Sequence, residues 1–589
     1  MKNSPLLRCL AIYREMPKRT VFTALLFLIV NGSLAWQQWL IGRALNEVRE
    51  GHVVVRLPGG VLDFHRAWFW LSLLGSVALF RALLQYGAWA SAQIIGQQLM
   101  VIIRERIFIQ VQRLDLAYHW RHGVGELLTR TTRDSDKVRD ALVIFWRQVV
   151  DTGTVALASV GILFWYSPWL GIVPLLLTVA GLAILVPQTD RLVALDRAVG
   201  ARYDAVSQDL AEGVHGVRVI KAFGLEGIRI DLFESQVAAF AAEARVALRF
   251  AAERIPVPQI VVALGNVWVL VCGAQLIGSG HLNIGELVAA LLTVNALVLR
   301  FEGIGAIIQT FADARSSSAR IWELLDAEPR ILTGSAHLPS GPLGFRFDSV
   351  RVAAPGGGND ILRDLSFRVD PGEVVALVGT TGSGKSTLTG LLPRLLDADG
   401  GTVLIGSSEE GWRDIRSLVL AEVRRRIHVV PQESFLFSDT IAANLRLTAP
   451  SAAEEEIREA LRLAAADEIV DGLPDGIETR VGDRGVTLSG GQRQRLCLAR
   501  ALLSQSSILG LDDATSALDA VTERIVLQNI RGLGNGSRRP VTLFIVSNRL
   551  STVLLADRVL LLAEGRIAAL GTPAELAATN AAYRDLMGI

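Results

Sequence analysis

The sequence predicts a multi-domain protein, in which an N-terminal all-α transmembrane domain of six helices precedes a C-terminal α/β P-loop ATPase domain. Composition gives the first support for this prediction: the 589 residues are 51% hydrophobic and only 20% charged, and the apolar residues concentrate in the first half. Soluble proteins of this size carry more charge. A glycine-rich loop then follows a short apolar run in the second half, as in a P-loop.

Six apolar stretches precede about residue 310, and each is long enough, or nearly so, to cross about 30 Å of hydrocarbon as a helix. They are approximately Thr20–Ala44, Ala67–Ala90, Leu142–Tyr166, Pro168–Pro187, Ile260–Ile277 and Leu287–Ile307. The basic residues before the first stretch are Lys2, Arg8, Arg14, Lys18 and Arg19. The positive-inside rule therefore predicts a cytosolic N-terminus, and an even number of spans places the ATPase domain in the cytosol as well.

Two connections between the predicted spans, residues 90–142 and 188–259, are long, polar and helix-patterned. They are too long for simple loops, so we expect helices that continue out of the membrane. Polar residues also occur inside the spans: Arg81, Asn31, Asn266, Asn295 and Arg300. Such residues are costly in lipid, and two interpretations stay open. They line a cavity for an anionic or amphipathic substrate, or they form structural hydrogen bonds between helices.

The nucleotide-binding motif begins where Val374–Val378 predicts a buried strand. The residues that follow are Gly379, Thr380, Thr381, Gly382, Ser383, Gly384, Lys385, Ser386 and Thr387. Backbone N–H groups of such a loop and the start of the next helix bind phosphate oxygens. Lys385 would neutralise the β- and γ-phosphates, and the Ser386 hydroxyl would ligate Mg²⁺. By itself the motif indicates only an NTPase.

A second motif narrows the class. Its residues are Leu488, Ser489, Gly490, Gly491 and Gln492, at the start of a helical pattern that runs to about Leu503. This run resembles the signature of ATP-binding cassette (ABC) transporters. Three more segments resemble motifs of that family, namely the Q-loop around Gln432, the Walker B pair Asp512-Asp513 and the D-loop Ser516–Asp519. Residues 125–134 and 212–226 are similar to the intracellular coupling loops of ABC exporters. The resemblance extends over essentially the whole chain.

The resemblance implies a domain organisation and a set of ligands. Residues 1–325 would form the transmembrane domain, 326–340 a linker and 341–589 the ABC nucleotide-binding domain. ATP would bind along residues 379–387 with Gln432 and Asp519, and Mg²⁺ would be held by Ser386, Gln432 and Asp512. In this family the signature grips the γ-phosphate of ATP held by the opposite subunit, so Ser489 and Gly491 would act on a partner's ATP.

Two positions depart from the family. Asp513 stands where the family usually has the glutamate that polarises the attacking water, and its side chain is one methylene shorter. A general base must lie within about 2.6–3.2 Å of its proton, and losing it forfeits roughly 10²–10⁴-fold in rate. Asn548 stands where the family usually has a histidine that contacts the γ-phosphate. Gly510, inside the preceding apolar run, is expected to weaken that strand.

These departures predict one subunit of a heterodimeric ABC exporter. Its own site would bind ATP and hydrolyse it weakly, while its signature would complete the site of a second half-transporter with the usual Glu and His. We expect ATP-driven export of a small amphipathic or hydrophobic substrate (drug, lipid or peptide) through a bacterial inner membrane. The near-neutral net charge of +1 gives no support for nucleic-acid binding.

Three alternatives stay open. One is a homodimeric exporter or lipid flippase with slow ATPase activity, and another is a siderophore importer on the same fold. The last is a regulatory membrane protein that binds ATP without transport.

Overall fold

The computed structural model describes residues 4–56, 62–301, 304–354, 359–482, 485–532 and 540–589. The chain divides into two compact units, which are described separately below. The first unit comprises Met1–Gln112 and Val124–Ala327, and the second comprises Arg113–Gly123 and Glu328–Ile589. The short segment Arg113–Gly123 therefore belongs with the C-terminal unit, and the backbone N–H of Arg330 donates to its Asp115 carboxylate at 3.0 Å.

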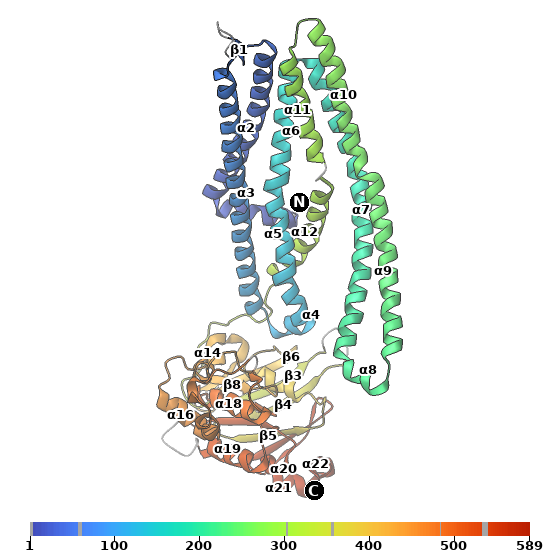
Figure 1. The fold of residues 1–589 in the computed structure, drawn as a ribbon. Helices are drawn as coiled ribbons and strands as arrows, with labels where there is room; N and C mark the ends of the chain where they lie inside the picture. Colours follow the sequence, from blue (N-terminus) through green and yellow to red (C-terminus); the bar gives the residue numbers. More distant parts are fainter. Residues whose placement is uncertain (1–3, 57–61, 302–303, 355–358, 483–484, 533–539) are drawn as a thin grey trace. The chain divides into compact units, whose positions relative to one another are not determined.

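The first unit is almost entirely helical (Figure 1). Its elements, including the part of α4 assigned to the second unit, are α1 (Pro5–Ala11), α2 (Pro17–Arg49), β1 (Val55–Arg56), β2 (Leu62–Asp63), α3 (His65–Arg113), α4 (Leu116–Thr129), α5 (Ser135–Ile144), α6 (Asp151–Tyr166), α7 (Pro168–His215), α8 (Val217–Phe223), α9 (Glu226–Arg254), α10 (Pro256–Gly278), α11 (Ile284–Phe301) and α12 (Ile304–Leu325). The 3₁₀-helix η1 (Ile12–Glu15) joins α1 to α2, and π-helical turns η2 (Arg130–Asp134) and η3 (Phe145–Val150) flank α5.

Five helical stretches in the described part of the chain are long and apolar enough to cross a membrane. They are Pro17–Arg49, His65–Arg113, Leu116–Tyr166, Pro168–His215 and Glu226–Gly278. The sixth predicted span, Leu287–Ile307, falls on α11 and the start of α12, and residues 302–303 between them lie outside the described residues. The count of six spans therefore stays a prediction.

The long connections are helical, as the sequence predicts. α3 continues to Arg113, and α7 continues to His215, where the short α8 links it to α9 (Figure 1). α9 packs beside the part of α7 that leads to α8, and α10 packs beside the rest of α7 (Figure 1). Gly224, with φ of 63°, ends α8 in the left-handed conformation that glycine adopts without steric cost. A second glycine, Gly123, has φ of 68° and kinks α4.

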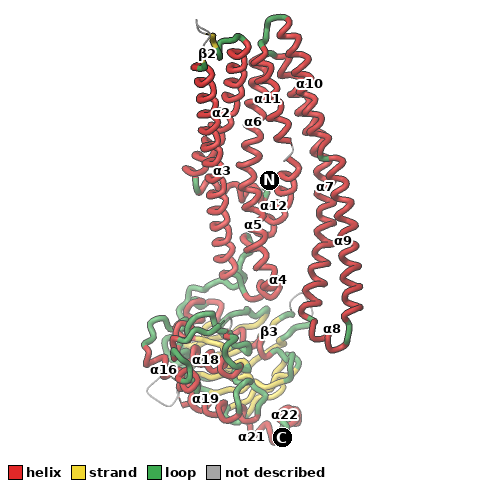
Figure 2. The backbone as a smooth tube through the Cα atoms, in the orientation of Figure 1, coloured by secondary structure: helices red, strands yellow, loops and turns green. Residues whose placement is uncertain are grey.

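The second unit contains two sheets covered by helices (Figure 2). The six-stranded sheet has the order β12-β11-β5-β10-β9-β8, parallel except for β12, and the antiparallel sheet has the order β4-β3-β6-β7. The strands are β3 (Gly344–Val352), β4 (Leu362–Val369), β5 (Val374–Gly379), β6 (Gly400–Ser407), β7 (Gly411–Asp414), β8 (Ile427–Val430), β9 (Ile508–Asp512), β10 (Thr542–Val546), β11 (Arg558–Ala563) and β12 (Arg566–Gly571).

The helices of the second unit are α13 (Lys385–Leu391), η4 (Ile415–Ser417), α14 (Leu420–Arg426), α15 (Ile441–Arg446), α16 (Glu454–Leu463), α17 (Asp467–Asp471), η5 (Gly476–Glu478), α18 (Gly490–Leu503), α19 (Ala520–Gly532), α20 (Leu550–Val553), α21 (Pro573–Thr579) and α22 (Ala581–Met587). Every residue of β5, β9 and β10 is buried, as is usual for parallel strands covered on both faces. These three strands are neighbours and end at one edge of the sheet, which is where ligands bind in open α/β sheets.

Candidate functional site

The P-loop joins the buried strand β5 to helix α13, as predicted. Gly382 and Gly384 have φ of 81° and 102°, backbone values that residues with a Cβ rarely adopt. The Lys385 ammonium donates to the carbonyl oxygens of Gly379 and Thr380, each at 2.8 Å, so it folds over the start of the loop. Burial lowers the pKa of Lys385. Ser383 is 3% exposed and its hydroxyl has no hydrogen-bond partner among the residues that the structure describes, which fits a loop that receives phosphate oxygens.

The predicted Mg²⁺ residues meet at the same edge. The Thr389 hydroxyl lies 3.0 Å from the Ser386 carbonyl oxygen and 3.3 Å from the Asp512 carboxylate, so it ties the start of α13 to the end of β9. The side-chain amide of Gln432 donates a hydrogen bond of 3.2 Å to the carboxylate of Asp513, the residue that follows Asp512. No group of three or more His, Cys, Asp or Glu in the described part of the chain could hold a metal alone. A magnesium ion here would depend on nucleotide phosphates, as is usual for this ion.

Asp513 follows β9 with φ of 52°, a left-handed conformation that costs a non-glycine residue roughly 1–2 kcal/mol. Its backbone N–H donates to the Val546 carbonyl oxygen at 3.1 Å, which joins it to the neighbouring strand β10. Burial raises the pKa of the Asp513 carboxyl. The shortened side chain therefore sits in a constrained position beside Gln432.

Asn548 follows β10 and faces the first residue of the P-loop. Its Oδ1 accepts a hydrogen bond from the Gly379 N–H at 3.2 Å, and its Nδ2 donates to the Gly379 carbonyl oxygen at 3.1 Å. The same carbonyl oxygen accepts from Lys385. Both polar atoms of the Asn548 amide are therefore engaged by one backbone residue.

The signature residues begin helix α18. Ser489 is its N-cap, where the Ser489 hydroxyl accepts from the Gln492 N–H at 3.3 Å and the Gln492 side chain accepts from the Ser489 N–H at 2.8 Å. This reciprocal capping uses the N–H groups of Ser489 and Gln492 and does not use those of Gly490 and Gly491. A helix start of this kind is an anion-binding site. Leu488, which is 7% exposed, anchors the segment in the core.

Contacts join most of the predicted residues at the P-loop, whereas the signature is in contact with the D-loop. The P-loop, Gln432, Asp512, Asp513 and Asn548 are joined by the contacts above. Within the described residues, no hydrogen bond links Ser489 or Gln492 to residues 379–387. The signature instead adjoins the D-loop, because a Cβ on Gly491 would lie 2.9 Å from the Ala517 carbonyl oxygen. Asp519 caps α19, accepting from the Thr522 N–H at 3.0 Å.

Four contact residues were missed by sequence reasoning: Thr389, Gln494, Glu523 and Arg549. Thr389 joins Ser386 and Asp512, and the other three surround the D-loop. Arg549 directly follows Asn548, so its position in the motif was the available signal. Gln494 and Glu523 gave none, since their partners are distant in the sequence.

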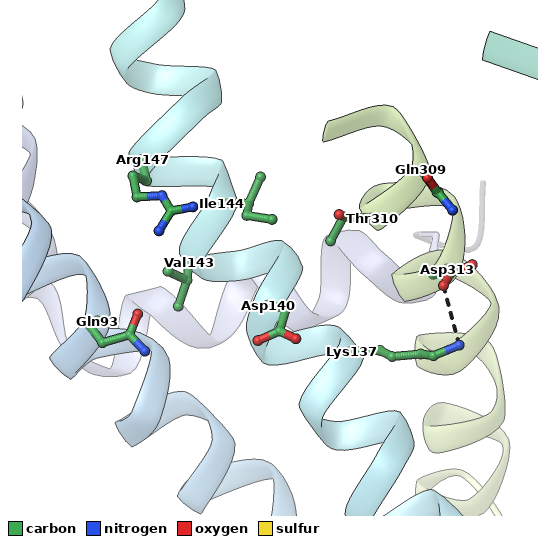
Figure 3. A pocket seen from close by; sticks show the side chains of 9 residues that line it. All are labelled: Gln93, Lys137, Asp140, Val143, Ile144, Arg147, Gln309, Thr310 and Asp313. Atoms are coloured by element: carbon green, nitrogen blue, oxygen red, sulfur yellow. Dashed lines mark ion pairs between the residues drawn. The ribbon is translucent and has the colours of Figure 1, made fainter. Parts of the chain in front are cut away.

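The membrane unit contains a cavity of about 470 Å³ (Figure 3). It is lined from α3, α5, η3 and α12 by Gln93, Lys137, Asp140, Val143, Ile144, Arg147, Gln309, Thr310 and Asp313. Lys137 and Asp313 face each other across it as an ion pair at 3.3 Å. The cavity therefore presents both cationic and anionic groups beside the apolar Val143 and Ile144.

The polar residues predicted inside the spans do not line this cavity. They contact other helices: Arg81 donates to Gln37 at 3.1 Å, Asn31 to Thr154 at 2.5 Å and Asn266 to Asn295 at 3.3 Å, while Arg300 pairs with Asp151 at 2.5 Å. The interpretation of these residues as structural links between helices fits these contacts.

Comparison with known proteins gives two family matches. Residues 21–301 match the ABC transporter transmembrane region, and residues 362–516 match the ABC transporter family. The multidrug resistance-like ATP-binding protein MdlA of Escherichia coli is 31% identical over 91% of this chain and 90% of its own length. An ATP-dependent lipid A-core flippase of Bordetella pertussis is 32% identical over 89% of this chain and 83% of its own length.

Two further similarities differ in coverage. The multidrug efflux ATP-binding/permease protein Rv0194 of Mycobacterium tuberculosis is 35% identical over 82% of this chain, which spans only 40% of that relative's length. The solved structure of a bacterial Atm1-family ABC exporter with ATP bound superposes with a TM-score of 0.82 at 25% identity. That match covers 97% of this chain and 98% of the exporter chain.

Proposed function

This chain belongs to the ABC transporter family, and we propose that it is one subunit of a heterodimeric exporter with two unequal ATP sites. The chain is an integral membrane protein with an ABC ATPase domain, and its relatives include multidrug efflux proteins and lipid A-core flippases. These relatives support ATP-driven export. The proposal adds that this chain's own site binds ATP, hydrolyses it weakly, and works beside a competent site completed by a partner.

The proposed organisation follows the predicted boundaries. Residues 1–325 form the transmembrane domain with six spans, 326–340 the linker and 341–589 the nucleotide-binding domain. Both the N-terminus and the ATPase domain lie in the cytosol, at a bacterial inner membrane. The five apolar helices, and α11 at the position of the last predicted span, support this arrangement.

One observation carries the proposal of a weak site, namely the pairing of Asn548 with Gly379 at 3.1 and 3.2 Å. The Asn548 amide directs its oxygen and one of its two N–H groups to the backbone of Gly379, so at most one N–H is left for a phosphate oxygen, and the short side chain is already held at the start of the loop. Asp513 adds to the effect, because its carboxylate is one methylene short of the usual base. ATP would be held by residues 379–387, with Mg²⁺ at Ser386, Gln432 and Asp512, and would supply the phosphoryl group for transfer to water.

The signature of this chain is intact and supports a role in the opposite site. Ser489 and Gln492 cap α18 and leave Gly490 and Gly491 open to an anion. We therefore infer that Ser489 and Gly491 stabilise the γ-phosphate held by a second half-transporter. That partner carries Glu and His at the positions of Asp513 and Asn548, and its site drives the transport cycle.

The substrate proposal rests on the cavity of Figure 3. Charged groups of both signs beside apolar side chains suit an amphipathic molecule with a polar head, such as a drug, a lipid or a peptide. The lipid bilayer is the second partner of the membrane unit, whose helices expose large apolar side chains, among them Trp68, Leu83 and Leu157.

A homodimeric exporter or lipid flippase with slow ATPase activity is the second candidate. The flippases among the relatives favour it, since they match this chain over most of their length. It predicts that this chain, purified without any partner, hydrolyses ATP or flips lipid by itself. A siderophore importer on the same fold would instead show nucleotide-dependent uptake.

Restoring the two departures tests the proposal. The double variant Asp513→Glu, Asn548→His, expressed with its native partner, should raise ATP hydrolysis at this chain's own site by at least about tenfold. The matched control is Asp513→Asn with Asn548→His, which lacks any base. If the double variant binds ATP as the wild type does and gains no hydrolysis, the weakness of this site does not come from these residues.

A further inference from the structure

The D-loop of this chain is held by one arginine, Arg549, at the start of α20. Arg549 Nη1 donates to the carbonyl oxygens of Leu518 at 2.9 Å and Thr515 at 3.3 Å, and its Nη2 donates to that of Ser516. One guanidinium therefore binds three carbonyl groups of the turn 515–518. Arginine carries its donors on separate nitrogens of a planar fork, so it can reach carbonyl groups along a turn, whereas the donors of an ammonium group share one nitrogen.

Glu523 fixes the arginine. Its Oε2 accepts from Arg549 Nη1 at 3.0 Å, and its Oε1 accepts from the hydroxyls of Thr515 at 2.6 Å and Thr552 at 2.9 Å. Glu523 is only 1% exposed, so its charge depends on these partners. The turn, α19 and α20 thus share one buried, fully bonded carboxylate.

The opposite side of the turn is held by the signature helix. Gln494 of α18 is 5% exposed; its Nε2 donates to the Ser516 hydroxyl at 3.1 Å and its Oε1 accepts from the Ala517 N–H at 2.8 Å. The Ala517 carbonyl oxygen lies so close to Gly491 that a Cβ there would meet it at 2.9 Å. The turn therefore lies between the segment after β10 and the signature glycines.

Asp513, which precedes the turn, is also hydrogen-bonded to it. Its carbonyl oxygen accepts from the Ser516 N–H at 3.2 Å, and its own φ of 52° is sterically costly. A strained conformation persists only where its surroundings enforce it. The contacts of Arg549 with the turn supply part of that enforcement.

We propose that Arg549 is a positioning residue that fixes both nucleotide sites through the 515–518 turn. On one side the turn sets Asp513 beside this chain's own P-loop, and on the other it supports the signature glycines. This inference rests on the proposed function only for the statement that the signature serves the opposite site. Loss of the Arg549 contacts should loosen the turn and slow hydrolysis at either site, while ATP still binds the P-loop through groups that Arg549 does not touch.

The test compares Arg549→Lys with the matched control Arg558→Lys in the full-length chain within its native assembly. Arg558 also pairs with a carboxylate, Glu373, and with a backbone carbonyl, that of Arg368, but it lies on β11 away from the nucleotide motifs. Two quantities are measured: hydrogen exchange of the backbone amides of residues 513–519, and the dependence of ATP turnover on ATP concentration.

Arg549→Lys should speed exchange in residues 513–519 by about tenfold. It should lower maximal turnover by about tenfold and leave the KM for ATP within about twofold. Arg558→Lys should leave the exchange rate, the maximal turnover and the KM unchanged. Unchanged exchange, faster exchange with unchanged turnover, or a raised KM with unchanged maximal turnover would each overturn the proposal.

Ser516→Ala provides a second variant if Arg549→Lys fails to fold. It removes only the hydroxyl that Gln494 binds, so it leaves the buried Glu523 pairing intact. The proposal predicts a smaller change of the same kind, and no change in exchange would contradict it. The exchange experiment does not depend on which site hydrolyses ATP, so its failure is distinguishable from that of the proposed heterodimer.

Discussion

The side-chain amide of Asn548 forms a two-point contact with the backbone of Gly379, with hydrogen bonds of 3.2 Å to Oδ1 and 3.1 Å from Nδ2. An amide carries its donor and its acceptor side by side on one carbon, so it can bond to the N–H and the C=O of a single residue. The two nitrogens of a histidine ring point in diverging directions and cannot reproduce this contact. Asn548 therefore holds the start of the P-loop in place through two hydrogen bonds.

These two hydrogen bonds should contribute to the free energy of unfolding. Asn548→Ala should lower the free energy of unfolding by about 1 kcal/mol, since two partly exposed hydrogen bonds are lost. Asn548→Asp should cost at least as much, because one carboxylate oxygen would face the Gly379 carbonyl oxygen. Thermal unfolding of the full chain in detergent measures both variants. Equal stability of wild type and both variants would show that the contact contributes nothing.

The signature and the P-loop should be separable by mutation. Ser489→Ala removes the N-cap hydroxyl of α18, and we expect hydrolysis by the assembled transporter to fall more than about tenfold. Photolabelling of this chain by azido-ATP should stay unchanged. Lys385→Ala should do the reverse, abolishing labelling of this chain while part of the hydrolysis remains. Loss of labelling in Ser489→Ala would contradict a role for the signature in the other site.

Motifs whose residues are close together in the sequence could be predicted from the sequence alone. The strand before Gly379, the loop and the start of α13 follow from a short apolar run and the glycines after it, and Ser489 with Gln492 forms a capping box whose two members are three residues apart. Such features depend on local conformation alone. The sequence therefore predicted the P-loop and the helical start of the signature.

Contacts between residues that are far apart in the sequence could not be predicted from it. Arg549 and Glu523 are 26 residues apart and come together only because β9 and β10 pair. Gly510 was expected to weaken β9, but it pairs with β8 and β10, and a Cβ there would lie 2.8 Å from Val429 Cγ2. The glycine thus permits close packing of the neighbouring strand. Likewise, the partner of Arg81 is Gln37 on another helix, which no periodicity indicates.

The membrane unit contains an ion pair with a buried carboxylate and a guanidinium that is 31% exposed, and this pair should be structural. Asp151 is 1% exposed and lies 2.5 Å from Arg300. Arg300→Gln should destabilise the chain by about 3 kcal/mol, because it leaves a buried carboxylate unpaired. The double variant Asp151→Asn, Arg300→Gln should recover most of that loss. Melting temperatures in detergent give the comparison, and equal melting of the single and double variants would refute the pairing.

The cavity of Figure 3 predicts a binding effect at Arg147. Arg147→Gln should weaken the stimulation of ATP hydrolysis by an anionic amphipath such as phosphatidylglycerol by about three- to tenfold, since one cationic group is lost from the lining. Arg139→Gln is the control, because its guanidinium is already bound by Asp140 at 2.7 Å. An equal effect of both variants would indicate a general response to charge.

The proposed heterodimer requires an unlike partner, and co-purification tests for that partner. The tagged chain is purified gently from its native membrane, and the proteins retained with it are identified and quantified by mass spectrometry. A heterodimer should yield a second half-transporter at about one-to-one, with Glu and His at the positions of Asp513 and Asn548. Recovery of a homodimer with no such partner would contradict it, and Asp513 and Asn548 would then have to support all the hydrolysis that occurs.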